Sequence, residues 1–78
     1  MEFLFKDEAE KDLEYWYKTD KSIIKKIELL LQSIIVTPFT GIGHPEPLRK
    51  NLAGYWSRRI NREHRIIYTV ENNTITVY

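Results

Sequence analysis

The hydrophobic periodicity of this chain changes once, and that change limits the folds open to it. Over residues 7–36, apolar side chains recur every three to four positions, as they do on one face of an α-helix. Over residues 55–78, they fall in short β-like runs separated by turn residues. Helices followed by hairpin-connected strands predict an α+β domain, in which the helices lie on one side of a mainly antiparallel sheet.

The expected order of elements is β-α-α-loop-β-β-β. An opening strand at residues 1–5 precedes two helices, which form a tight antiparallel hairpin, and Thr19 or Asp20 caps the second helix. The first helix should pack through Ala9, Leu13, Trp16 and Tyr17, and the second through Ile23, Ile24, Ile27, Leu30, Leu31 and Ile34. The later strands are expected at Tyr55–Ile60, His64–Val70 and Thr74–Tyr78, so the sheet should have four strands. Asn72-Asn73 suits a type I′ turn between the last two.

Between the helices and the later strands, residues 37–51 show no periodicity. This stretch contains all three prolines, Pro38, Pro45 and Pro47, and two of the three glycines, Gly41 and Gly43. Loops of this length inside a small domain are uncommon and often functional.

Composition narrows the class of protein further. Seventy-eight residues provide one domain, residues 1–78, and the absence of cysteine excludes disulfides and thiolate metal sites. His44 and His64 are too few and too far apart to indicate a metal, and no nucleotide-binding motif occurs, so no cofactor is expected. No apolar stretch is long enough to span a bilayer and no signal peptide precedes the first helix, which indicates a cytoplasmic protein.

Charge is distributed unevenly along the chain. Residues 1–40 have a net charge of −2, whereas residues 41–78 have a net charge of +3 and contain all five arginines. Arginine suits bidentate phosphate contacts better than lysine does, although an ordinary charged sheet face explains the pattern equally well.

The loop between the first two later strands decides how two of these arginines lie. If Asn61–Glu63 is a three-residue loop, Arg59 faces Arg65, and Trp56 pairs with Tyr68 on the opposite face. Like charges directly opposite are destabilising unless an anion lies between them, so this register favours a phosphate site. A four-residue loop would place the two arginines on opposite faces and remove the argument. We favour the three-residue loop because of the aromatic pair.

A carboxylate in the proline-rich stretch is the candidate general base. Glu46 lies between Pro45 and Pro47, which stiffen the backbone on both sides. A rigid carboxylate near cationic groups can accept a proton from a substrate. A surface glutamate in a proline-rich turn is the commoner case, and the residues alone do not distinguish the two.

Three segments together carry a family resemblance. Residues 37–48 read TPFTGIGHPEPL, residues 51–60 read NLAGYWSRRI and residues 63–68 read EHRIIY. They resemble the TPFxGxGxPEPL, NLxGxWSRRI and EHRxxY patterns of the YoeB/Txe toxins, which belong to the RelE-like superfamily with its microbial-RNase-like fold. The resemblance covers the whole chain.

The resemblance implies a ribosome-dependent endoribonuclease, an mRNA interferase that cuts messenger RNA in the ribosomal A site without a metal. Glu46 would be the general base, Arg65 would stabilise charge developing on the phosphate, and Arg59 would be a second phosphate contact. Arg49 and Lys50 would hold the RNA backbone, and Arg58 and Arg62 complete the predicted RNA-binding set.

One departure from the family pattern concerns the end of the chain. Family members continue past the last strand into a short segment that ends in His-Tyr, whose histidine is the general acid, whereas this sequence ends at Tyr78. The resemblance therefore implies a truncated chain with weak or no activity. The alternative function is a non-catalytic module that binds antitoxin and ribosome.

The resemblance also implies partners and a location. Family toxins are neutralised by a small antitoxin, usually of the YefM/Axe type in this branch, whose acidic disordered segment the basic half should attract. The expected location is the bacterial cytoplasm, with no membrane contact. A homodimer is also consistent with the family, although no hydrophobic pattern in the sequence indicates a dimer interface.

Overall fold

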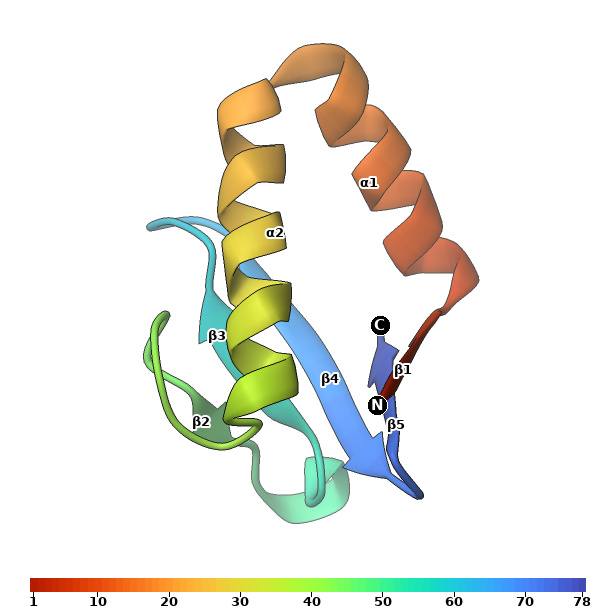
Figure 1. Cartoon of the computed structure of the whole chain (residues 1–78), viewed down its shortest axis with the longest axis vertical. Helices are drawn as coiled ribbons and strands as arrows, with labels where there is room; N and C mark the ends of the chain where they lie inside the picture. Colours follow the sequence, from red (N-terminus) through yellow and green to blue (C-terminus); the bar gives the residue numbers. More distant parts are fainter.

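The computed structural model describes residues 1–78 and places two helices against one face of a five-stranded sheet (Figure 1). Strand β1 leads directly into the helical hairpin, and the remaining strands follow the loop. The elements are β1 Glu2–Phe5, α1 Asp7–Thr19, α2 Lys21–Val36, β2 Glu46–Pro47, a 3₁₀ turn at Lys50–Leu52, β3 Trp56–Arg59, β4 Arg65–Glu71 and β5 Thr74–Val77. The predicted α+β class and the order of the main elements are confirmed.

The sheet order is β1-β5-β4-β3-β2, and the parallel pairing of β1 with β5 is its only exception to antiparallel pairing. The first and last strands of the chain therefore lie side by side. The predicted number of four strands is wrong, because Glu46 and Pro47 pair with Ser57 and Trp56 as a short fifth strand. Proline is tolerated there because β2 is an edge strand, where one side of the backbone needs no partner.

Both predicted hairpin registers are confirmed. Arg59 lies opposite Arg65, and Trp56 lies opposite Tyr68, as a three-residue loop requires. In the second hairpin, Asn72 and Asn73 have φ values of 49° and 62°, the left-handed conformation that a type I′ turn needs at both central positions.

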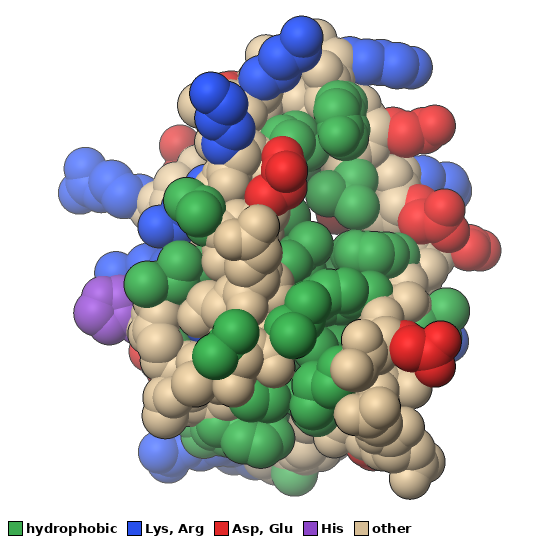
Figure 2. Space-filling model, in the orientation of Figure 1, with side chains coloured by type: hydrophobic (Ala, Val, Ile, Leu, Met, Phe, Trp, Pro, Cys, Tyr) green, Lys and Arg blue, Asp and Glu red, His purple; other side chains and the backbone are tan.

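The core lies between the helices and the inner face of the sheet. It joins Ala9 of α1 and Leu30 and Ile34 of α2 to buried side chains of β4 and β5, namely Ile66, Tyr68, Ile75 and Val77. The prediction that Tyr17 lies on the buried face of α1 is wrong, because Tyr17 is 62% exposed. In the view of Figure 2, hydrophobic side chains gather along and between the helices, and acidic ones gather on the side of α1.

The single residue between the helices caps the second one. Asp20 accepts hydrogen bonds from the backbone N–H and the hydroxyl of Ser22, at 3.0 and 2.6 Å. These bonds, chiefly that from the hydroxyl, lower the pKa of the Asp20 carboxyl below its ordinary value. Neither helix has the length and apolarity that crossing a membrane would require.

Gly43 lies where the long loop packs against the core residue Leu30, and we expect its replacement by alanine to be costly. Its φ is +82°, and an added Cβ would lie 2.6 Å from the Cδ2 atom of Leu30. Combined backbone strain and overpacking should lower the free energy of unfolding by about 2–5 kcal/mol. Urea denaturation measures this difference.

Gly54 provides the matched control for that substitution. Its φ is +95°, but an added Cβ would meet nothing within 4 Å. Gly54→Ala should therefore show only the backbone cost, about 1–3 kcal/mol. Equal losses for the two variants would contradict the close packing of Gly43 against the core.

Candidate active site

The outer face of the sheet, which the helices do not cover, carries the charged residues that the sequence singled out. Side chains alternate between the two faces of a strand, so Ser57 and Arg59 of β3 share a face. Arg65 of β4 lies opposite Arg59, and Glu46 of β2 lies opposite Ser57, which places both on that same face. The structure thus brings Glu46, Arg59 and Arg65 together on one face across three neighbouring strands.

Arg65 links this group. Its Nη1 atom lies 4.0 Å from Oε2 of Glu46 and donates a 3.1 Å hydrogen bond to Oγ of Ser57. The Arg65 and Glu46 side chains are 41% and 57% exposed, so both remain accessible to a ligand, whereas Ser57 is buried. The serine hydroxyl therefore fixes the direction of the guanidinium, and the carboxylate lies beside it.

Ser57 was not predicted as a site residue. The available signal was its alternation with Arg59, which places both on one face once the strand is recognised. The hydrogen bond to Arg65, however, depends on where the strands meet, and a short hydroxyl gives no sequence pattern of its own.

Arg59 is exposed and makes no ion pair in the structure. It faces Arg65, whose charge is only partly balanced by Glu46 at 4.0 Å. Two arginines at directly opposite positions on a solvated sheet face form an arrangement that an anion stabilises, and a phosphate can accept hydrogen bonds from guanidinium groups.

The prediction that Arg58 binds RNA is wrong. Its side chain is fully buried on the inner face of β3, where the core excludes any nucleic acid. The guanidinium donates to the hydroxyl of Tyr68, to Oγ of Ser33 and to three loop carbonyls, those of Thr37, Thr40 and Ile42. Arg58 is therefore a core residue that holds the long loop.

The other predicted RNA-binding residues are exposed. Arg49 and Lys50 follow β2 at the start of the 3₁₀ turn, and Arg62 lies in the turn between β3 and β4. They flank the group formed by Glu46, Arg59 and Arg65 along the chain, and none of them forms an ion pair with it. They add positive charge to this part of the sequence.

Two tyrosines extend the outer face beyond the charged group. The rings of Tyr55 and Tyr78 pack with their centroids 5.0 Å apart. The neighbouring Tyr78 raises the pKa of the Tyr55 hydroxyl above its ordinary value of 10.0. Tyr55 is therefore protonated at neutral pH and does not act there as a general base.

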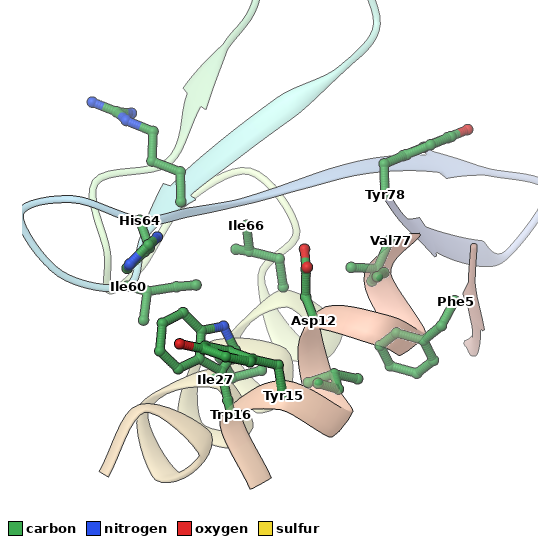
Figure 3. A pocket seen from close by; sticks show the side chains of 13 residues that line it. Phe5, Asp12, Tyr15, Trp16, Ile27, Ile60, His64, Ile66, Val77 and Tyr78 are labelled. Atoms are coloured by element: carbon green, nitrogen blue, oxygen red, sulfur yellow. The ribbon is translucent and has the colours of Figure 1, made fainter. Parts of the chain in front are cut away.

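A cavity of about 400 Å³ lies on the other side of the sheet, between α1 and the strands (Figure 3). Its lining is mostly apolar and includes Trp16, whose ring meets that of His64 edge-on at 4.9 Å. Asp12 points into this space from α1. Of the three predicted catalytic residues, Arg65 alone lines the cavity, so the cavity and the charged group share that one side chain.

The charged group has the parts needed for acid–base chemistry at a phosphate. An accessible carboxylate can accept a proton, and the adjacent guanidinium groups can stabilise charge that develops on a phosphoryl oxygen. No cluster of three or more His, Cys, Asp or Glu side chains is arranged to hold a metal ion.

Comparison with known proteins gives a consistent family signal. Residues 5–78 match the family described as the YoeB-like toxin of the bacterial type II toxin–antitoxin system. Toxin YoeB of Escherichia coli K12 is 46% identical over 77 residues, which cover 99% of this chain and 92% of the relative.

Solved structures agree with that match. A YoeB/ParE toxin from Agrobacterium tumefaciens superposes with a TM-score of 0.97 at 39% identity, covering all of this chain and 93% of the other. The YoeB chain of a heterotetrameric YoeB–YefM toxin–antitoxin complex from Staphylococcus aureus is 46% identical, with a TM-score of 0.92 over 99% of this chain and 90% of the other. A YoeB dimer from the same organism is similar to the same degree, with a TM-score of 0.93 at 46% identity and the same coverage.

Proposed function

Since the chain belongs to the YoeB-like toxin family of bacterial type II toxin–antitoxin systems, we propose that it is a ribosome-dependent endoribonuclease that cuts messenger RNA in the ribosomal A site. The observation that supports this most directly is the placement of Glu46 beside Arg65, with Arg59 opposite, on the open face of the sheet. That arrangement supplies a base and two cations at one place.

The proposed reaction is attack of a ribose 2′-oxygen on the adjacent phosphorus. Glu46 takes the proton of the 2′-hydroxyl as the new P–O bond forms, and the bond to the 5′-oxygen breaks. The departing 5′-oxygen takes a proton from water, so the products are a 2′,3′-cyclic phosphate and a 5′-hydroxyl. Arg65 stabilises the negative charge that builds on the non-bridging oxygens, and Arg59 holds the same phosphate from the facing strand. The chemistry uses no metal in this proposal, so EDTA added in an amount that binds transition-metal ions but leaves the Mg²⁺ that ribosomes require should not lower the rate.

The RNA backbone is held by the exposed cations around this group. Arg49, Lys50 and Arg62 can each contact a phosphate without fixing a base, so they add affinity and little sequence preference. Arg58 is excluded from this role because it is buried.

Cleavage of messenger RNA on programmed ribosomes tests the proposal. Primer extension should show a new 5′ end within the A-site codon when the chain is added, and none when ribosomes are omitted. Ribosome binding without any cut would instead favour the alternative of a non-catalytic antitoxin- and ribosome-binding module. Absence of both binding and cleavage would contradict the proposed function.

The proposed partner is an antitoxin of the YefM type, the kind present in the complex of the Staphylococcus aureus relative. Residues 41–78 have a net charge of +3, and several of their cations are exposed. A homodimer like that of the other Staphylococcus aureus structure is a second assembly to test, by sedimentation of the free chain. Because the proposed substrate is messenger RNA on ribosomes, the proposed location of the protein is the bacterial cytoplasm.

We expect the association rate with an acidic YefM-type segment to fall steeply as salt rises. Electrostatic steering raises association rates well above those of neutral partners, and salt screens it over about 10 Å at 0.1 M. Stopped-flow measurements at several salt concentrations give the slope. Lys25→Gln on α2 removes one charge far along the chain from the basic half and should change the slope less than Lys50→Gln does. A rate independent of salt would contradict capture by charge.

A further inference from the structure

The strongest feature outside the charged group is the buried cation Arg58. Its guanidinium is completely enclosed, and the structure's single ion pair, between Arg65 and Glu46, does not involve it. A buried charge without an opposite charge is costly unless hydrogen bonds satisfy it. Arg58 meets that condition with oxygen acceptors alone.

The acceptors come from two parts of the chain that must be held together. Nη1 donates to Oγ of Ser33 at 2.7 Å and to the Ile42 carbonyl at 3.1 Å, and Nη2 donates to the carbonyls of Thr37 and Thr40 at 2.6 and 2.7 Å. Ser33 and Thr37 lie at the C-terminal end of α2, where the helix dipole is negative. The positive charge therefore joins the end of α2 to the first part of the loop.

Tyr68 completes the arrangement from the neighbouring strand. Its hydroxyl accepts a 3.0 Å bond from Nε of Arg58 and donates a 2.7 Å bond to the Pro38 carbonyl. By contrast, residues 38–45 make few backbone bonds of their own outside the strands, Thr40 N–H to Thr37 at 3.4 Å and Arg59 N–H to the Gly43 carbonyl at 2.7 Å. The loop thus depends on side chains of the core for its shape.

We propose that Arg58 is a positioning residue, whose guanidinium fixes residues 37–43 so that the chain reaches β2 with Glu46 opposite Ser57. This inference rests on the proposed function of Glu46. The side chains of Arg58 and Glu46 point to opposite faces of the sheet, so Arg58 does not touch RNA in this proposal. It acts through the loop, whose far end carries the carboxylate into place beside Arg65.

Lysine cannot replace this side chain. The Arg58 fork uses all three of its nitrogens in fixed directions on acceptors from α2, the loop and β4. A lysine retains the charge but offers one nitrogen with three donors, which cannot reach all of these groups together. Arg58→Lys therefore separates the geometry of the fork from the presence of a positive charge.

Two backbone amides report the loop and the sheet separately. The Arg59 N–H donates to the Gly43 carbonyl, so its hydrogen exchange follows docking of the loop, whereas the Ile60 N–H donates to His64 within the hairpin. In Arg58→Lys, exchange at Arg59 should rise about tenfold or more, because bonds to a charged group are lost, while exchange at Ile60 stays unchanged. Lys25→Met, an exposed charge removed from α2, is the control and should change neither amide.

Single-turnover cleavage on programmed ribosomes provides the second readout, at a temperature where every variant is folded by circular dichroism. In Arg58→Lys, the loosened loop should leave Glu46 out of position. The maximal cleavage rate should therefore fall about 100-fold, while the ribosome concentration that gives half the maximal rate stays unchanged. Tyr68→Phe, a milder change that removes the bonds to Arg58 and Pro38, should produce the same effects in smaller size. It keeps the test available if Arg58→Lys does not fold.

The outcomes separate the two proposals. Unchanged exchange at Arg59 and an unchanged maximal rate in both variants would overturn the positioning role of Arg58. If the unmodified chain cuts no RNA, the proposed function is contradicted. Faster hydrogen exchange at Arg59 in the variants would still support the inference that Arg58 fixes the loop. A loss of affinity with the maximal rate retained would also overturn the inference, since it would mean that Arg58 contributes to binding.

Discussion

Glu46→Gln should lower the single-turnover rate of RNA cleavage by about 10²–10⁴-fold, the usual contribution of a positioned general base. Glutamine has nearly the same shape and can still lie opposite Ser57, but it cannot accept the 2′-hydroxyl proton as a carboxylate does. Because the Glu46 side chain is more than half exposed, the substitution should leave the free energy of unfolding almost unchanged. Quenched-flow cleavage on programmed ribosomes measures the rate.

Glu28→Gln gives the matched control for that substitution, since it removes an exposed carboxylate from α2, away from the charged face. Its rate should equal that of the unmodified chain. If Glu46→Gln cuts as fast as Glu28→Gln, Glu46 is not the base, and the charged group on β2, β3 and β4 would be a binding surface only. Ribosome affinity, measured in parallel, should be the same for both variants.

Much of the fold follows from local patterns. The register that brings Arg59 opposite Arg65 was predictable because loop length sets the pairing of a hairpin, and a slip by one residue would expose the side of the strand that carries Trp56. The core face of α2 was predictable for the same kind of reason, since its buried isoleucines recur at helical spacing.

The missed features depend on contacts between distant segments. Strand β2 has two residues, and neither Glu46 nor Pro47 shows a strand pattern; the strand exists because the edge of β3 lies beside it. The position of Glu46 in the site therefore came from the family resemblance and not from periodicity.

The prediction for Arg58 is wrong because a charge alone does not place a side chain on the surface. Alternation along β3 places it on the same face as Trp56, which the predicted register puts opposite to the face of Arg59 and Arg65. That was the available signal against surface exposure. Its partners, however, are carbonyls of the loop and of the end of α2, and the sequence does not show where backbone oxygens converge.

Arg65 should be the more sensitive of the two arginines in the charged group, and Arg65→Ala should lower the maximal cleavage rate by about 10²–10³-fold. The guanidinium is the group that the structure places next to Glu46 and orients through Ser57, so its charge is already directed before substrate binds. Preorganised charge of this kind stabilises a transition state more than a flexible cation does, because little reorganisation is needed when the charge develops.

A series of substitutions on this one contact separates charge from orientation. Arg65→Lys retains the charge and loses the fork, so its rate should lie between those of Arg65→Ala and the unmodified chain. Ser57→Ala retains both charges and removes only the 3.1 Å bond that directs the guanidinium, and we expect a loss of about tenfold. Arg59→Ala, on the facing strand, should mainly weaken binding of the substrate phosphate. Equal rates for Arg65→Ala and Arg65→Lys would mean that charge at this position is not enough without the fork, whereas a Ser57→Ala rate equal to that of the unmodified chain would show that the guanidinium is directed by the bound phosphate and not by the sheet.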